Sequence, residues 1–298
     1  MTSTPLLATR AGAGGLPLVA LRAADGAAAD VYLHGAHVTS WRPVPGEEER
    51  LFLSARTEFR SGAAIRGGIP VIFPQFAAEG PLVRHGFART SEWRLVSVHR
   101  SDAGDAVATL SLSDSPTSNA LWHAEFRAQL TVRVGGPRLV VALDVENIGA
   151  SPFSFTCALH TYLRVRDVGE VEVVGLHGAR YRESADPTTL IADDAPTLRV
   201  TGELDRVYVS APRTLMLREP QRTLGIEVRE FPDVVLWNPG HARASALHDM
   251  EPDGERAMLC VEAAAVQTPI TLGAGARWHG SQALDAAAGV AGATGSTR

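Results

Sequence analysis

Two ionisable residues lie in stretches of the sequence that are otherwise largely apolar. His160 lies in CALHTYLRV, and Glu262 lies in MLCVEAAAV. An ionisable side chain in apolar surroundings is costly unless it is paired or functional. Because a histidine and a glutamate can act as general acid and base near neutral pH, the two residues are candidates for one catalytic pair. The structural alternatives, a hydrogen-bonded core histidine and a glutamate paired with an arginine, stay open.

The segment Ile65–Arg89 carries a second set of side chains suited to chemistry. It reads IRGGIPVIFPQFAAEGPLVRHGFAR. Its glycines permit sharp bends and its prolines fix φ and remove backbone donors, so we expect a stiff, irregular loop around a short apolar run. Arg66, Arg84 and Arg89 each offer a forked donor that suits phosphate or carboxylate. The segment predicts the rim of a pocket for a small polar anion, and a structural loop with solvated arginines is the alternative.

Asp205 and a pair of histidines give weaker signals. Asp205, in GELDRVY, follows a predicted turn and precedes a predicted strand. It could accept hydrogen bonds from sugar hydroxyls or orient the histidine, although the position alone is typical of a turn residue. His34 and His37 are three residues apart, which suits a metal ion only on a helix. The β-branched residues around them favour a strand, so we expect a turn with partly buried histidines.

The composition limits the class of protein. The chain has 298 residues, of which 45% are hydrophobic and 20% charged, and a net charge of −5. These values are typical of a soluble globular protein and argue against a general nucleic-acid binder or a protein of anionic membrane surfaces. No apolar stretch is long enough to cross a bilayer, and no secretory signal is evident in residues 1–7. We therefore expect a cytoplasmic protein.

Residue types that the sequence lacks exclude several chemistries. The sequence contains no lysine, which excludes Schiff-base catalysis, covalently bound pyridoxal phosphate and a phosphate loop with its lysine. Two cysteines, Cys157 and Cys260, cannot build a disulfide framework or a four-thiolate metal site. No nucleophile elbow or dinucleotide fingerprint is present. A glycoside hydrolase would need two suitably spaced carboxylates, and only Glu262 is a convincing candidate.

Short strands separated by turns dominate the chain. Residues 124–134 and 138–147 alternate between apolar and polar types around Gly135-Gly136-Pro137, which predicts a β-hairpin. Short helices are expected only at residues 119–127 and 242–249. Many strands without alternating helices indicate an all-β antiparallel sandwich, which we place in one domain over residues 1–282. We expect the glutamates at 47–49 to be solvated and residues 283–298 to form a disordered tail.

Several short motifs, taken together and in order, resemble those of the glucose-6-phosphate 1-epimerase (hexose-6-phosphate mutarotase) family. The matches extend from about residue 30 to 272. They are Gly35-Ala36-His37-Val38-Thr39-Ser40-Trp41, Arg66-Gly67-Gly68-Ile69-Pro70, Phe73-Pro74-Gln75-Phe76, His85-Gly86-Phe87-Ala88-Arg89, Leu159-His160-Thr161-Tyr162, Leu204-Asp205-Arg206-Val207-Tyr208, Val235-Leu236-Trp237-Asn238-Pro239 and Cys260-Val261-Glu262.

This resemblance implies a galactose-mutarotase-like antiparallel β-sandwich, or supersandwich, with no metal and no organic cofactor. By position, His160 matches the catalytic acid of the family and Glu262 its catalytic base. The substrate-binding positions that we carry over, with the arginines serving a phosphate, are Arg66, Arg84, Arg89, Asp205, Gln75 and His85.

The chain departs from the family pattern in three places, one of which is Ala263-Ala264, where many members have Pro-Gly and where we expect no effect on the chemistry. Arg84 stands where the family usually has glutamine, which adds positive charge beside the expected phosphate site. Gly240 stands where an aromatic residue usually follows Asn-Pro, and we expect it to widen the pocket.

The resemblance implies an isomerase that interconverts the α and β anomers of a hexose 6-phosphate, glucose 6-phosphate above all, by acid–base ring opening. The expected partner is a small sugar phosphate, with no nucleic acid and no membrane, and the expected state is a monomer. A mutarotase of unphosphorylated aldoses and a non-catalytic carbohydrate-binding sandwich are the alternatives.

Overall fold

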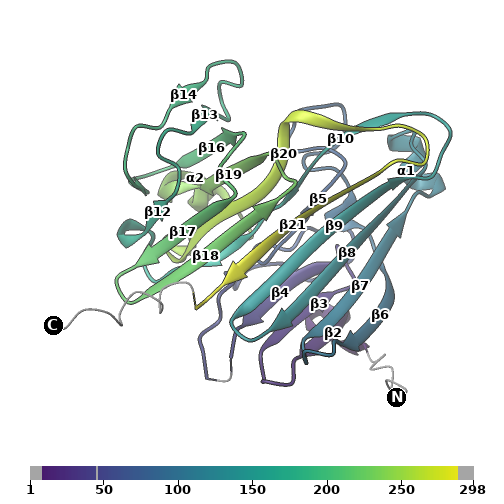
Figure 1. Cartoon of the computed structure of the whole chain (residues 1–298), viewed down its shortest axis with the longest axis horizontal. Coiled ribbons are helices and arrows are strands. Elements are labelled where there is room, and N and C mark those ends of the chain that lie inside the picture. Colours follow the sequence, from purple (N-terminus) through teal and green to yellow (C-terminus); the bar gives the residue numbers. More distant parts are fainter. Residues whose placement is uncertain (1–8, 45, 288–298) are drawn as a thin grey trace.

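The computed structural model describes residues 9–44 and 46–287, and strands make up most of this part of the chain (Figure 1). The named strands pair antiparallel in three sheets, which confirms the predicted all-β class. A four-stranded sheet has the order β1 (Thr9–Ala11), β2 (Pro17–Arg22), β3 (Ala28–Tyr32), β4 (His37–Arg42).

The two larger sheets form the body of the fold (Figure 1). The first has the order β14 (Ile191–Ala192), β13 (Arg180–Glu183), β16 (Leu204–Val209), β19 (Asp233–Asn238), β20 (Met258–Leu272), β10 (Phe153–Leu159), β5 (Val71–Ile72), and β11 (Tyr162–Arg164) also pairs with β20. The second has the order β15 (Leu198–Arg199), β12 (Glu172–Val174), β17 (Thr214–Glu219), β18 (Arg222–Arg229), β21 (Arg277–Asp285), β9 (Arg138–Asn147), β8 (Phe126–Gly135), β7 (Ala106–Ser113), β6 (Arg94–Arg100). We call these the eight-stranded and the nine-stranded sheet.

The main core contains buried side chains from all three sheets, and the period of two along each strand produces it. In β9, Leu139, Val141, Leu143 and Val145 are buried, whereas the alternate residues Val140, Ala142 and Asp144 face the other side of the sheet. The pairing of β8 with β9 runs from Phe126 opposite Asn147 to the turn at residues 136–137. The predicted hairpin and its buried face are therefore confirmed.

Helices are short, and both begin earlier than the sequence pattern predicted. The first, α1 (Pro116–Leu121), starts at Ser115, whose hydroxyl accepts a hydrogen bond from the Ser118 amide in a capping box. The expected stretch 119–127 is cut short because Phe126 and the residues after it belong to β8. The second, α2, spans Gly240–Ala246 instead of residues 242–249, and four 3₁₀ turns lie at Ala13–Gly15, Ala88–Thr90, Val168–Glu170 and Gly254–Ala257.

The segment Ile65–Arg89 crosses from the small sheet to the edge of the eight-stranded sheet with only two residues in a strand, β5. Gly68 has φ 61°, and a Cβ there would lie 2.2 Å from the carbonyl oxygen of Val38. Gly86 has φ 66°, and a Cβ there would lie 2.3 Å from the carbonyl oxygen of Phe73. Only glycine permits such close backbone contacts, so the predicted stiff, irregular loop is confirmed.

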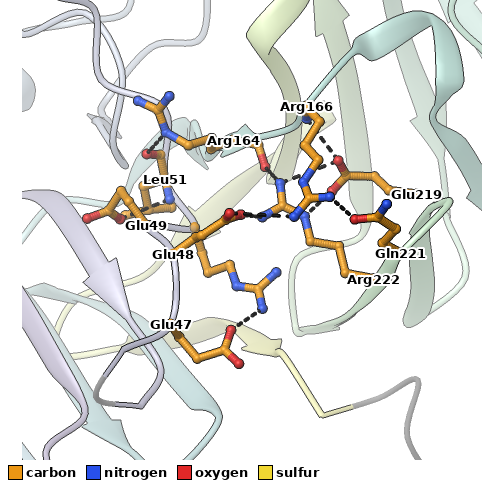
Figure 2. Close-up of polar contacts among 10 residues, drawn as sticks. Glu47, Glu48, Glu49, Leu51, Arg164, Arg166, Glu219, Gln221 and Arg222 are labelled. Carbon is orange, nitrogen blue, oxygen red and sulfur yellow. Dashed lines mark hydrogen bonds and ion pairs between the residues drawn. The ribbon is translucent and has the colours of Figure 1, made fainter.

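An ion-pair network, shown in Figure 2, joins the loop after β4 to the turn between β17 and β18. The Glu48 carboxylate lies 3.2 Å from Arg222 and 3.5 Å from Arg166. Arg222 also donates to the Arg164 carbonyl at 2.9 Å and to the nearly buried Glu219 carboxylate. The predicted solvated run is confirmed for Glu47 and Glu48, whose side chains are 42% and 62% exposed and still form ion pairs, whereas Glu49 is partly buried.

The C-terminal boundary also differs from the expected one. Strand β21 continues to Asp285, and Ala283 and Leu284 are buried because they pair with both β18 and β9. The expected domain end at 282 was therefore too early, and of the tail predicted for residues 283–298, residues 288–298 lie outside the described residues. Among the residues described, no helix is long and apolar enough to span a bilayer.

The aromatic cluster around Phe73 gives a prediction for stability. Phe73 is fully buried, and its ring contacts those of Phe87, Trp122, Phe126 and Phe155 at centroid distances of 5.2–6.4 Å. We expect Phe73→Ala to lower the free energy of unfolding by about 3–5 kcal/mol, because it removes buried apolar surface and leaves a cavity.

Urea denaturation followed by tryptophan fluorescence measures this change. Val83→Ala, at a side chain of the same segment that is 63% exposed, is the matched control and should change the free energy by less than about 0.5 kcal/mol. Equal effects of the two substitutions would contradict a core role for Phe73.

Candidate active site

The register of three neighbouring strands places the candidate site on the side of the eight-stranded sheet that faces away from the main core. Along β20, Val261 and Ala263 belong to the core, so Cys260 and Glu262 lie on the opposite face. Val235 of β19 is the partner of Glu262, and Trp237 is the partner of Cys260 and of Asp205 in β16. Sheet pairing therefore gathers residues that are up to 57 positions apart.

A hollow of about 730 Å³ lies over this face of the sheet. We call it the site hollow, and it is lined by both members of the predicted catalytic pair, by the three arginines of the predicted rim, by Asp205 and by His85. The structure thus brings together all but one of the catalytic and substrate-binding residues that the sequence predicted. The exception is Gln75, which does not line the hollow.

His160 lies at a break in a strand rather than inside one. It follows β10 and precedes β11, and its amide donates to the Pro70 carbonyl at 3.0 Å. The next amide, of Thr161, donates back to Leu159 at 2.9 Å, which makes a tight turn. This turn releases the imidazole from the strand alternation and presents it to the hollow.

The turn at His160 is held by a residue from the nine-stranded sheet. Gln282 of β21 is buried, and its Oε1 accepts a hydrogen bond from the Thr161 hydroxyl at 2.5 Å. The amide nitrogen of the same side chain donates to the Val261 carbonyl at 2.9 Å. Gln282 therefore fixes the two strands that carry His160 and Glu262.

The imidazole and the carboxylate face one another. The distance from Nδ1 of His160 to Oε1 of Glu262 is 3.2 Å, and the side chains are 9% and 1% exposed. Oε2 of Glu262 is buried without a hydrogen-bond partner in the described part of the chain. The histidine ring stacks on Tyr162 with an interplanar angle of 10°. The carboxylate therefore has an oxygen free to accept a proton from a substrate.

Burial pushes this pair towards its uncharged form. The pKa of His160 lies well below its usual value because of burial, with Arg89 and Arg66 adding to the effect. The pKa of Glu262 lies well above its usual value because of burial, and the Asp205 carboxylate adds to the effect. Without substrate, a single proton shared within a neutral pair is the favoured state.

The three arginines differ in how their charge is balanced. Arg66 lies 3.1 Å from Asp249 and donates to the Tyr162 hydroxyl at 3.0 Å. Arg89 donates only to the Arg84 carbonyl, at 3.1 Å, and its Nε is buried without a partner. Within residues 9–44 and 46–287, no carboxylate lies within 4.0 Å of the Arg84 or Arg89 guanidinium. Arg84 and Arg89 are therefore two positive charges without a carboxylate partner among these residues, although the hollow is also lined by carboxylates, among them Glu203 and Asp205, which share Arg243.

Burial lowers the pKa of Arg89 to about 10. The guanidinium still carries its charge at neutral pH, because that value lies well above 7. An unbalanced buried cation is costly by itself, so this region of the hollow favours an anion.

His85 and Gln75 have different positions in the same loop. His85 lines the hollow, and its Nδ1 accepts a hydrogen bond from the Ala77 amide at 3.2 Å. Burial lowers its pKa strongly, so it is a neutral imidazole whose Nε2 carries the proton. Gln75 instead donates to the carbonyls of Ala77 and Leu82 and accepts from the Leu82 amide. We therefore interpret Gln75 as a support of the loop, not as a contact of the substrate.

Asp205 lies within β16, not in the turn that its context suggested, because the strand already begins at Leu204. Its carboxylate accepts from the Ser184 hydroxyl at 2.5 Å and lies 3.5 Å from Arg243. Gly240 itself does not line the hollow, and the expectation that it widens the pocket stays a prediction. A Cβ at Gly240 would lie 2.8 Å from the Glu203 amide nitrogen, and its φ of 61° suits glycine.

The predicted histidine pair is structural. Nε2 of His34 lies 2.6 Å from the Ala63 carbonyl, and Nε2 of His37 lies 2.7 Å from the Gly67 carbonyl. Both side chains are buried, and these contacts tie the β4 region to the arginine-bearing loop. The interpretation as buried histidines near a turn was therefore the better one.

Cys260, His160 and Glu262 form the one cluster of the described site whose donor atoms lie close enough together to hold a metal ion. The Cys260 sulfur lies within 4.8 Å of donor atoms of His160 and Glu262. The thiol is covered by Tyr162 and Trp237 and does not line the hollow. Burial raises its pKa well above the usual value, so the thiolate that a metal needs is disfavoured. The arrangement does not fit a metal centre with an open position.

The sequence reasoning missed several residues of the site. Asp249, Gln282 and Arg243 gave no signal, because each acts through a partner on a distant element. Tyr162 and Trp237 were present in the quoted motifs, and their rings enclose His160 at centroid distances of 4.8 and 5.9 Å.

Comparisons with known proteins agree with this arrangement. The family model described as aldose 1-epimerase matches residues 17–285. A Cenchrus ciliaris protein provisionally named glucose-6-phosphate 1-epimerase is 36% identical over 281 residues, which covers 91% of this chain and 85% of the relative. A protein of the same provisional name from Escherichia coli is 37% identical over 238 residues, with 78% of each chain covered.

A solved structure shows the same fold. The crystal structure of YeaD from Salmonella typhimurium, provisionally described as a mutarotase, superposes with a TM-score of 0.85. The identity is 28%, and 96% of each chain is covered.

The burial of the two cysteines predicts their reactivity. Cys157 and Cys260 are both fully buried, and burial raises the pKa of each thiol. We expect Ellman's reagent at pH 8 to leave the native protein unlabelled and to react with both thiols after denaturation. Rapid labelling of Cys260 in the native protein, located by peptide mass spectrometry, would contradict the packing around Glu262.

Proposed function

Because the chain belongs to the aldose 1-epimerase family, we propose that it interconverts the α and β anomers of a hexose 6-phosphate, with glucose 6-phosphate as the expected substrate. Two curated relatives, 36% and 37% identical over the aligned residues, are provisionally named glucose-6-phosphate 1-epimerase. One observation supports the proposal above the others. A buried imidazole–carboxylate pair opens into the same hollow as three guanidinium groups.

The pair suits the proton transfers of ring opening. A cyclic aldose opens when the anomeric hydroxyl loses a proton and the ring oxygen gains one. Glu262, as carboxylate, accepts the first proton, and His160, as imidazolium, donates the second. The C1–O5 bond breaks, the C1–C2 bond rotates, and closure on the other face reverses both transfers. Each positioned transfer typically contributes about 10²–10⁴-fold to the rate.

The arginines suit the phosphate. Arg84 and Arg89 have no carboxylate partner among the residues described, and a phosphate monoester carries about −1.5 to −2 charges at pH 7. The charge of these two guanidinium groups therefore suits the charge of the expected ligand. Arg66 adds a third guanidinium, already oriented by Asp249 and Tyr162.

Asp205 and His85 suit the sugar hydroxyls. Asp205 presents a carboxylate acceptor and His85 a neutral N–H donor to the same hollow. With Glu262 and His160 they provide donors and acceptors around one ring. The expected cytoplasmic location and monomeric state stay predictions.

One comparison of substrates distinguishes the proposed function from two alternatives. A mutarotase of unphosphorylated aldoses would act on glucose as well as on glucose 6-phosphate. A non-catalytic sugar-binding protein would bind either sugar without accelerating exchange. Two-dimensional exchange NMR on both sugars, with enzyme-free samples as reference, distinguishes them. We expect acceleration that is much greater for glucose 6-phosphate.

The role of the carboxylate gives a first prediction. Glu262→Gln keeps the shape of the side chain and removes the base, so we expect the rate of anomer exchange to fall by about 10²–10⁴-fold. Because the arginines are unchanged, binding of glucose 6-phosphate measured by calorimetry should change little. Near-normal exchange in this variant would defeat the assignment.

The role of the guanidinium groups gives a second prediction. Arg89→Ala should raise the KM for glucose 6-phosphate by about 10–100-fold, since hydrogen bonds between charged groups contribute about 1.5–3 kcal/mol. The KM for glucose should change much less. Arg94→Ala, at an exposed arginine of β6 outside the hollow, is the matched control. Equal increases of KM for both sugars would count against a phosphate contact.

A further inference from the structure

The His160–Glu262 pair can hold its shared proton in two ways. With the proton on Glu262, both groups are neutral; with the proton on His160, the pair is an imidazolium and a carboxylate. Only the second form supplies the acid and the base of the proposed reaction. Both side chains are at least nine-tenths buried, and burial favours the first form.

The charges around the pair also oppose the reactive form before substrate binds. His160 shares the hollow with Arg66, Arg84 and Arg89, and their positive charges disfavour an imidazolium. On the other side, the Asp205 carboxylate disfavours a second carboxylate at Glu262, while the weaker effect of Arg84 favours it.

The remaining groups packed against His160 do not offset this effect. His85, whose ring centroid lies 5.6 Å away, is neutral because burial lowers its pKa. Tyr162, stacked on the imidazole, is an uncharged phenol, since burial raises its pKa. The positive charge of Arg84 and Arg89 therefore acts on the imidazole until an anion neutralises it.

We propose that the phosphate group of the substrate, on binding to the three arginines, moves the shared proton from Glu262 to His160 and so converts the pair into its reactive form. The proposal rests on the proposed function. The two atoms lie 3.2 Å apart, but Nδ1 makes no hydrogen bond among the residues that the structure describes, so the transfer requires the imidazole and the carboxyl group to align. The O–H bond at Oε1 then breaks and the N–H bond at Nδ1 forms, so no proton enters or leaves. The imidazolium then carries a second proton at Nε2 for the ring oxygen of the sugar.

A short path of contacts connects the phosphate site to the imidazole. The Arg66 guanidinium donates to the Tyr162 hydroxyl at 3.0 Å, and the Tyr162 ring stacks on His160 with centroids 4.8 Å apart. Charges at such distances interact strongly where water is largely excluded. Neutralising the arginines therefore changes the balance between the two proton positions, and the phosphate contributes to turnover as well as to affinity.

The inference can be tested with the sugar ring and the dianion supplied as two separate molecules. D-Xylose has the ring of glucose without the C6 arm, and phosphite supplies a separate dianion. We expect saturating phosphite to raise kcat/KM for xylose anomer exchange by at least about tenfold, the usual effect of one nearby charge on a protonation equilibrium. Exchange NMR measures the rate, chloride keeps the ionic strength constant, and enzyme-free samples give the catalysis by phosphite alone.

Two variants sharpen the measurement. Arg89→Gln keeps a hydrogen-bond donor and removes the charge that acts most on His160, so the activation at saturating phosphite should fall, not only the affinity for phosphite. Arg94→Ala should behave as the unmodified protein.

A second readout is independent of activity. In protein labelled with ¹⁵N-histidine, phosphite should move the His160 ring signals towards those of an imidazolium, with His160→Gln identifying the signals. If phosphite binds but leaves both the xylose rate and these signals unchanged, the phosphate is an anchor only and the inference is overturned. Absence of phosphite binding overturns it as well. Failure to exchange the anomers of glucose 6-phosphate would instead defeat the proposed function.

Discussion

The burial of an imidazole against a carboxylate is the constraint on which the rest of the site depends. Neither group is stable there as an isolated charge, so the fold must place both on one face and within contact of each other. Strand alternation places Glu262 on the side of the sheet away from the core, and a turn between β10 and β11 directs His160 to the same side. The 3.2 Å contact follows from these two local features.

The charge distribution of the hollow follows a second constraint. Most arginines of the chain that approach a carboxylate do so on the surface or, as in Figure 2, between layers of the sandwich. Arg66 is balanced by Asp249, whereas Arg84 and Arg89 have no carboxylate within 4.0 Å in the described chain. The excess positive charge is thus concentrated at one end of the hollow, next to the catalytic pair. The same guanidinium groups that suit a phosphate also govern the protonation of the imidazole.

Local sequence patterns predicted those features of the fold that depend on residues close together in the sequence. The hairpin around Gly136 could be predicted because its alternation and turn lie within 22 consecutive residues. His160, Glu262 and the three arginines could be identified by residue type in an unusual context, and the order of short motifs gave the family, which the comparisons confirmed. Gln75 was assigned to the substrate because its motif borders the site, yet its amide hydrogen bonds stay within its own loop. Asp249 and the true end of β21 could not be predicted, because each depends on a partner far away in the sequence.

The buried side chain of Gln282 has a consequence for how the protein is made. It reaches from β21 to the turn at His160, and β21 is the last strand in the described chain. On the ribosome, every other residue of the hollow is therefore synthesised before the one that fixes its histidine. A nascent chain can form most of the eight-stranded sheet, but its imidazole is held in place only when translation has passed residue 282 and the final strand has docked.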